Sequence, residues 1–136
     1  MADTPQVAEL RIVVTAKDYD AAIAFYRDAL GLPERGALSS PGGRVTILEA
    51  GRATLEIADP PHASYIDEVE VGRTGVAGHI RVAFQVTDAE GATRRLEAAG
   101  ARVIAEPTRT PWNSANARLD APAGLQLTLF EELGGE

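Results

Sequence analysis

Residues 78–100 read GHIRVAFQVTDAEGATRRLEAAG and contain the pattern of a strand followed by a helix. Apolar side chains occupy every second position of the first half, the period of a β-strand. Asp88 then precedes an alanine-rich segment that Gly100 closes, as expected for a helix with an N-cap and a C-terminal glycine. Residues 10–31, LRIVVTAKDYDAAIAFYRDALG, show the same order, and Asp18 stands 70 residues before Asp88. The sequence therefore predicts an internal repeat of two strand–helix units.

Each unit is followed by short strand-like segments, which predicts an α+β fold with the order βαβββ twice. In the first repeat we expect a hairpin of residues 44–49 and 53–58, after a turn at 41–43. In the second repeat we expect a strand at residues 102–105, a proline-punctuated loop after it, and a hairpin of residues 115–119 and 125–130. The predicted organisation is one domain with three parts: a first module (9–58), a linker (59–78) and a second module (79–132).

The linker is long for a simple connection, so we interpret it as a pocket lid or as an exchangeable hinge. It contains an acidic run, Asp67, Glu68 and Glu70, for which a solvated face is the simplest interpretation.

Composition restricts the functional class. The 136 residues are 45% hydrophobic and 24% charged, as in ordinary globular domains. No apolar run approaches the roughly 20 residues of a membrane span, and the N-terminus lacks a signal-peptide pattern, so we expect a cytoplasmic protein that does not bind membranes. The absence of cysteine excludes disulfides and thiolate chemistry. A net charge of −7 and a pI of about 4.8 argue against nucleic-acid binding.

Three segments carry a family resemblance: DYDAAIAFYRDALGL (18–32), DAEGATRRLEAAGARV (88–103) and DAPAGLQLTLFE (120–131). They resemble the vicinal oxygen chelate superfamily, which includes glyoxalase I, extradiol dioxygenases and bleomycin-resistance proteins. The resemblance covers residues 9–132. It implies two βαβββ modules that form a curved mixed sheet around a cavity, the glyoxalase/bleomycin-resistance fold, usually in a dimer. In the catalytic members the cavity holds one divalent metal.

The resemblance implies His and Glu ligands at four positions of that cavity. Counted from the capping aspartates and from the last turn, three of these positions fall on Arg11, Arg81 and Thr128, and only Glu56 matches. Arginine has no acceptor and stays protonated, so it does not ligate a cation. His79 lies two residues from one position, but one imidazole does not make a metal site. We therefore expect no metal and no cofactor.

Strand alternation places donor-rich and apolar side chains together on the cavity face. Such a mixture suits an uncharged or acceptor-rich ligand, for example a quinone, a carbonyl compound or a carboxylate. The candidate ligand-binding residues are Arg11, Glu56, Tyr65, Arg81, Gln85, Trp112, Asn113, Thr128 and Phe130. Two alternatives stay open, because Glu56 can instead pair with an arginine and Trp112 can instead fill the end of the core or a dimer interface.

Two functions remain. The first is a metal-free small-molecule-binding protein similar to the bleomycin- and enediyne-sequestering members, which confer antibiotic resistance by holding a drug in a pocket at a homodimer interface. The loss of three ligand positions favours it. The second is a divergent metal-dependent lyase, isomerase or dioxygenase that uses Glu56 with His79 or His62, or an acid–base catalyst that uses Glu56 alone.

Overall fold

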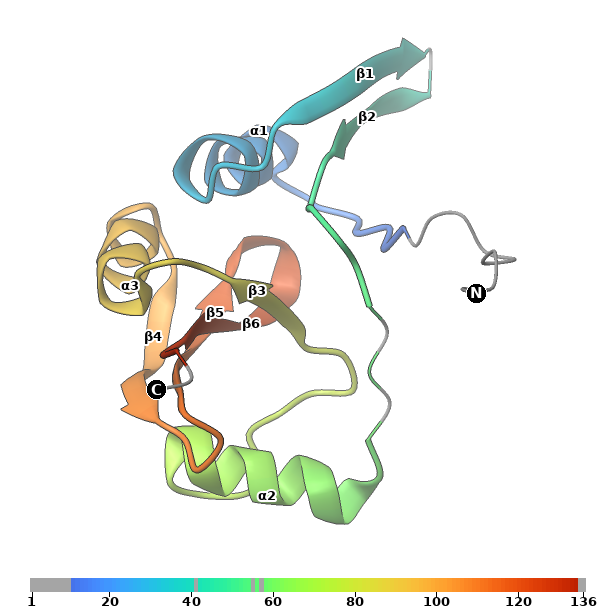
Figure 1. Cartoon of the computed structure of the whole chain (residues 1–136). Helices are drawn as coiled ribbons and strands as arrows, with labels where there is room; N and C mark the ends of the chain where they lie inside the picture. The colour runs from blue at the N-terminus through green and yellow to red at the C-terminus, as the bar shows by residue number, and fades with distance from the viewer. Residues whose placement is uncertain (1–10, 41, 55, 57, 135–136) are drawn as a thin grey trace, which may run out of the picture.

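The computed structural model describes residues 11–40, 42–54, 56 and 58–134. It confirms an α+β fold, with a two-stranded and a four-stranded sheet among the described residues (Figure 1). No helix in these ranges is long and apolar enough to cross a membrane. The elements in chain order are α1 (Tyr19–Ile23), the π-helix η1 (Ala24–Ala29), β1 (Glu34–Ser40), β2 (Gly43–Leu48), α2 (Pro60–Val71), β3 (Val82–Gln85), α3 (Ala89–Ala98), β4 (Arg102–Arg109), β5 (Ser114–Ala121), the 3₁₀ turn η2 (Pro122–Gly124) and β6 (Leu125–Glu132).

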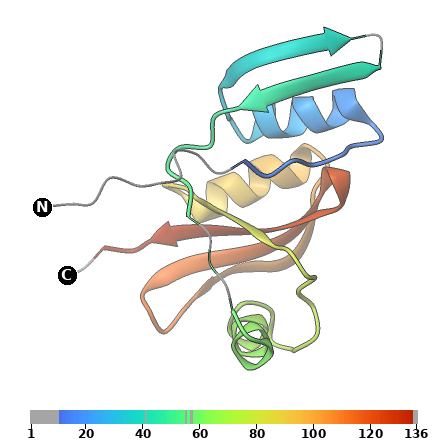
Figure 2. The ribbon, with the colours of Figure 1, turned by 90° about the vertical axis from the view of Figure 1, so that its right-hand side faces the viewer.

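The elements form layers. Figure 2 shows α3 and the α1–η1 helix on one side of the four-stranded sheet, with the β1–β2 hairpin beyond α1. α2 lies on the opposite side of the sheet, where the same view looks along its axis. The segment between the two repeats therefore covers the sheet face that the other helices leave open.

The four-stranded sheet has the order β3-β6-β5-β4. β3 runs parallel to β6, and the other neighbours are antiparallel. Alternate residues of β5 and β6 point toward α3, and among them Leu119, Leu127 and Leu129 have no exposed surface. They pack with Leu96 of α3 and Phe25 of η1. The predicted core face of the final hairpin is confirmed.

The predicted helix ends are also confirmed. Asp18 and Asp88 each accept a hydrogen bond from the backbone amide three residues further on, at 3.1 and 3.0 Å. These caps satisfy amides that lack a partner within the helix. Gly31 and Gly100 follow the two helices with φ of +93° and +117°, a conformation that glycine adopts without strain.

The first repeat differs from its prediction. Residues 11–16 belong to no strand, and Val13 is 85% exposed. Residues 43–48 form β2 and pair with β1, a strand that was not predicted, with Ser40 opposite Gly43 at a short connection that favours a hairpin. The expected apolar positions Leu10, Leu55 and Ile57 lie outside the described residues.

Two segments expected to be irregular are regular. β4 continues to Arg109 instead of ending at residue 105, because β5 pairs with it as far as Ala115. Residues 60–71 of the linker form α2. The acidic run of α2 is solvated only at Glu68, because Asp67 and Glu70 are 2% and 3% exposed. The interpretation of a solvated face was wrong for these two residues, which pair with the sheet.

Candidate functional site

A cavity of about 290 Å³ lies where α2 faces the sheet. Its walls combine acidic, basic and aromatic side chains from α2, from the segments around β3 and from β5 and β6. The lining residues are Glu56, His62, Ile66, Glu70, Arg81, Ala83, Trp112, Ser114, Asn116, Thr128, Phe130 and Glu132.

The position of α2 follows from its local sequence. Asp59 caps the helix by accepting a hydrogen bond from the His62 amide at 3.0 Å, and proline occupies the first turn, where no amide partner is needed. Gly72 ends the helix with φ of +89°. Asp67 and Glu70 are three residues apart and share one helix face, which lies against the sheet.

Arg118 of β5 is fully buried and holds that helix face. Its Nε donates to Glu70 Oε1 at 3.0 Å, and its Nη1 donates to Asp67 Oδ1 and to Gln126 Oε1, both at 2.8 Å. The second Asp67 oxygen accepts hydrogen bonds from the amides of Val76 and Ala77. α2 is therefore fixed to the sheet by buried ion pairs.

Glu70 collects three donors from the sheet. Besides Arg118, it accepts a hydrogen bond from Asn116 Nδ2 at 2.8 Å and one from the Thr128 hydroxyl at 2.9 Å. Arg81 Nη1 donates in turn to Thr128 Oγ1 at 2.6 Å. A continuous hydrogen-bonded chain thus runs from Arg81 through β6 to α2.

These contacts shift two pKa values. Burial acts to raise the pKa of Asp67, but the Ala77 amide, the Arg118 guanidinium and the Val76 amide outweigh it and lower that pKa below its usual range. Burial lowers the pKa of the Arg81 guanidinium, and neighbouring Arg118 adds to this effect, against the opposing influence of Glu70. Arg81 is therefore a half-buried cation, and Glu56 and Asp67 act on its pKa in the same direction as Glu70.

Five of the nine predicted ligand-binding residues line this cavity: Glu56, Arg81, Trp112, Thr128 and Phe130. Trp112 is 44% exposed, so part of its ring is open to solvent. Glu56 is exposed, and the structure shows no ion pair between it and Arg81. Whether these residues contact a ligand stays a prediction.

The other four predicted residues lie outside the cavity wall. The centre of the Tyr65 ring lies 6.4 Å from that of the Trp112 ring. Asn113 donates from Nδ2 to the Gly134 carbonyl, and Gln85 is exposed on β3. Arg11 lies near Glu49, whose pKa it helps to lower, although the main cause is the hydrogen bond from Arg35 to that carboxylate.

The buried residues of the network, Asp67, Glu70, Asn116 and Arg118, were not predicted as part of the site. One signal was available, because polar residues occupy alternate positions 114, 116 and 118 of β5 and therefore share one sheet face. A buried arginine on that face requires an acidic partner.

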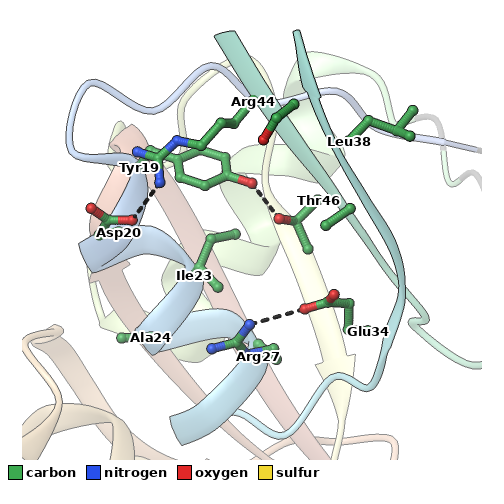
Figure 3. A pocket seen from close by; sticks show the side chains of 11 residues that line it. Tyr19, Asp20, Ile23, Ala24, Arg27, Glu34, Leu38, Arg44 and Thr46 are labelled. Atoms are coloured by element: carbon green, nitrogen blue, oxygen red, sulfur yellow. Dashed lines mark hydrogen bonds and ion pairs between the residues drawn. The ribbon is translucent and has the colours of Figure 1, made fainter.

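A second cavity, of about 420 Å³, opens between the α1–η1 helix and the β1–β2 hairpin (Figure 3). Its charged side chains pair with one another: Arg44 with Asp20 at 3.0 Å and Arg27 with Glu34 at 2.9 Å. The Arg44 guanidinium also lies 4.4 Å from the centre of the Tyr19 ring. Because these charges are already paired, a charged ligand would gain less from binding in the second cavity than in the first.

Comparison with known families gives the same fold. The sequence pattern of the Glyoxalase/Bleomycin resistance protein/Dioxygenase superfamily matches residues 10–129. The chain belongs to this superfamily.

Relatives within the glyoxalase superfamily include two proteins named "Putative glyoxylase CFP32", from Mycobacterium tuberculosis and Mycobacterium bovis. Each is 33% identical over 106 residues, which are 77% of this chain. The matched part is 36% of their length, so the chain spans about a third of these relatives.

Solved structures share the fold. A lactoylglutathione lyase from Agrobacterium tumefaciens is 30% identical, with a TM-score of 0.58 over 98% of this chain and 100% of that one. The hypothetical protein SA1046 from S. aureus has a TM-score of 0.61 at 14% identity, over 93% of this chain and 95% of that one, and shows the fold alone.

The residues present do not fit the divalent metal of the catalytic superfamily members. Arg81 and Thr128 stand at two of the four expected ligand positions and bond to each other. Arg11 stands at a third and lacks an acceptor. Within the described ranges, no group of three or more His, Cys, Asp or Glu side chains is placed to hold a metal ion. Of the four expected positions, only that of Glu56 carries a residue of the expected ligand type, His or Glu.

Proposed function

We propose that the chain is a metal-free small-molecule-binding protein, and that its role is antibiotic resistance by sequestration of an aromatic, acceptor-bearing natural product. The observation that carries this proposal is the hydrogen bond from Arg81 to Thr128. It joins two side chains at positions where a superfamily enzyme needs metal ligands, and it leaves the remaining guanidinium donors available to an acceptor.

The cavity chemistry supports this ligand class. Phe130 and Trp112 offer aromatic surfaces, and such surfaces bind flat rings. Arg81 is a cation at the same cavity with further guanidinium donors besides the one bonded to Thr128, and these favour a carbonyl or carboxylate oxygen beside it. A ligand with a ring and an oxygen acceptor satisfies both.

We also propose that the protein works as a homodimer. Ile12, Val13 and Ile80 are 55%, 85% and 60% exposed, although such side chains are normally buried. β3 is an edge strand of its sheet, and residues 11–16 belong to no strand. A second copy would cover these apolar side chains and supply the missing strand pairing.

The names of two relatives favour a second candidate, a lyase of the glyoxalase type. Such an enzyme would need a base within reach of its substrate, and Glu56 and His62 both line the cavity. Because the metal positions do not match, this candidate requires a ligand set different from that of the superfamily enzymes.

One pair of measurements separates the candidates. Trp112 is the only tryptophan, so its fluorescence reports ligands that enter the cavity. We expect quenching by flat aromatic carbonyl compounds such as 1,4-naphthoquinone, and divalent metal far below one equivalent in protein purified without chelators. Near-stoichiometric metal together with lyase turnover would replace the binding function by the enzymatic one.

A further inference from the structure

We propose that Glu70 occupies a carboxylate subsite of the cavity, and that an aromatic carboxylic acid binds by replacing the Glu70 carboxylate with its own. The inference rests on the proposed binding function and narrows its ligand class. It also gives α2 a role, because the helix then supplies the group that a ligand displaces.

The subsite is a set of donors that all belong to strands β5 and β6 of the sheet. Arg118 Nε, Asn116 Nδ2 and the Thr128 hydroxyl converge on one carboxylate, at 3.0, 2.8 and 2.9 Å. Arg118, Asn116 and Thr128 are 0%, 5% and 1% exposed. Three buried donors around one acceptor group form a typical carboxylate-binding site, in which a charge-assisted hydrogen bond contributes most.

Glu70 does not use the whole subsite. Arg118 Nη2 is fully buried and has no hydrogen-bond partner among the residues that the structure describes. It lies on the same edge of the planar guanidinium as Nε, the edge that binds a carboxylate through two parallel hydrogen bonds. Because the second Glu70 oxygen is held by Asn116, this edge bonds Glu70 through Nε alone. A donor therefore remains for an incoming acceptor.

The subsite opens into the cavity. Glu70, Asn116 and Thr128 belong both to the network and to the cavity wall. A carboxylate at the subsite thus places the rest of its molecule toward Phe130 and Trp112. The ligand class that uses both parts is a flat aromatic ring with a carboxylate attached.

The ligand must carry an aromatic ring, because the Glu70 carboxylate of the same chain competes with the ligand carboxylate for these donors. A tethered carboxylate has a high effective concentration, so a small acid such as acetate does not displace it. Ring contacts in the cavity give an aromatic acid the additional binding energy, and removing the charge of Glu70 removes the competitor.

The test uses 2-naphthoate as the acid and 2-naphthamide as its uncharged isostere. Binding of both is measured by calorimetry with the wild-type chain, with Glu70→Gln and with the matched control Glu68→Gln. Glu68 is exposed on the same helix. We expect the preference for naphthoate over naphthamide to rise at least about tenfold in Glu70→Gln, because a vacated charged site regains its anion, and to stay unchanged in Glu68→Gln.

An unchanged preference in folded Glu70→Gln overturns the inference. If both probes bind all three proteins equally, the proposed binding function stands and the carboxylate subsite fails. If neither probe binds any of them, both proposals fail.

A second measurement covers the case in which Glu70→Gln does not fold. Hydrogen exchange of the α2 amides is followed in the wild-type chain with saturating naphthoate and naphthamide. Faster exchange at residues 66–71 with naphthoate alone supports displacement of Glu70. Equal or slower exchange with naphthoate overturns it.

Discussion

Arg118 is the residue on which the contact between α2 and the sheet depends most. It is fully buried and pairs with two carboxylates. Replacing it by methionine keeps most of its volume but leaves Asp67 and Glu70 buried without their cation. We expect Arg118→Met to lower the free energy of unfolding by about 3–5 kcal/mol, measured by urea denaturation.

Arg94 on α3 provides the control for this substitution. It also contacts carboxylates, those of Glu90, Glu97 and Glu106, but its side chain is 44% exposed. Solvent screens these pairs, so Arg94→Met should cost less than about 1 kcal/mol. An equal loss of unfolding free energy in the two variants would mean that the buried ion pairs contribute no more to stability than the surface pairs.

Asp67 makes stability depend on pH. Its pKa is lower in the folded chain than the value of about 3.9 in unfolded chains. Its contribution is therefore complete above that value and is lost as the pH falls through the lower folded pKa. In urea denaturation from pH 7 to pH 2.5, we expect the stability difference between the wild-type chain and Asp67→Asn to shrink below about pH 4. A difference that stays constant across this range would contradict the assignment.

Trp112 tests the aromatic wall of the cavity. Its ring is 44% exposed and lies against Tyr65, so removing it leaves the core intact. We expect Trp112→Ala to weaken binding of an aromatic ligand by about 1–3 kcal/mol, measured by calorimetry. Val45→Ala, on the exposed face of the distant hairpin, should leave the affinity unchanged. An unaffected affinity in Trp112→Ala would give the tryptophan a purely structural role.

At the scale of elements, the N-caps of α1 and α3 determine where these helices begin, and they act through contacts within a few residues. Asp88 accepts a hydrogen bond from the Gly91 amide, and no other described side chain caps that amide. We expect Asp88→Ala to destabilise the protein by about 1 kcal/mol, measured as a lower midpoint of urea unfolding. Asp88→Ser should recover most of the loss, because serine also caps helices, and an equal loss in both variants would argue against capping.

The second repeat could be predicted from the sequence because its elements are encoded locally. The alternation in residues 78–86, the caps and the final turn all specify β3, α3, β5 and β6 without reference to distant residues. The first repeat could not be predicted as well, because the pairing of β2 depends on which neighbouring segment forms the tighter turn.

α2 could not be recognised for a different physical reason. Pro60 and Pro61 read as helix breakers, although proline is favoured in a first helical turn. The face that α2 buries carries Asp67 and Glu70, so the segment lacks the apolar stripe by which a packed helix is recognised. Four candidate residues, Glu56, Arg81, Thr128 and Phe130, reached the cavity wall because strand alternation is local, whereas the carboxylate partners of Arg118 lie about 50 residues away along the chain.

At the scale of the whole molecule, the exposed apolar residues around 11–16 test the proposed dimer. We expect sedimentation velocity to show a dimer at micromolar concentrations, and Val13→Asp to shift it to a monomer, because a charge at a buried apolar contact is costly. Leu133→Asp, on the exposed C-terminal segment, should remain dimeric. A wild-type monomer at 100 μM, a concentration well above that needed by stable dimers, would rule the proposal out.

The location of α2 also determines where the polypeptide can be divided. Every side chain of the buried network, from Asp67 to Thr128, lies after residue 58, whereas Phe25 of the buried apolar cluster comes from the first repeat. A break within residues 49–54 leaves both buried ion pairs of Arg118 in one fragment, and a break within residues 72–78 separates Arg118 from both of its carboxylates. Fragment complementation should therefore succeed with the first division and fail with the second, although both fall in connecting segments.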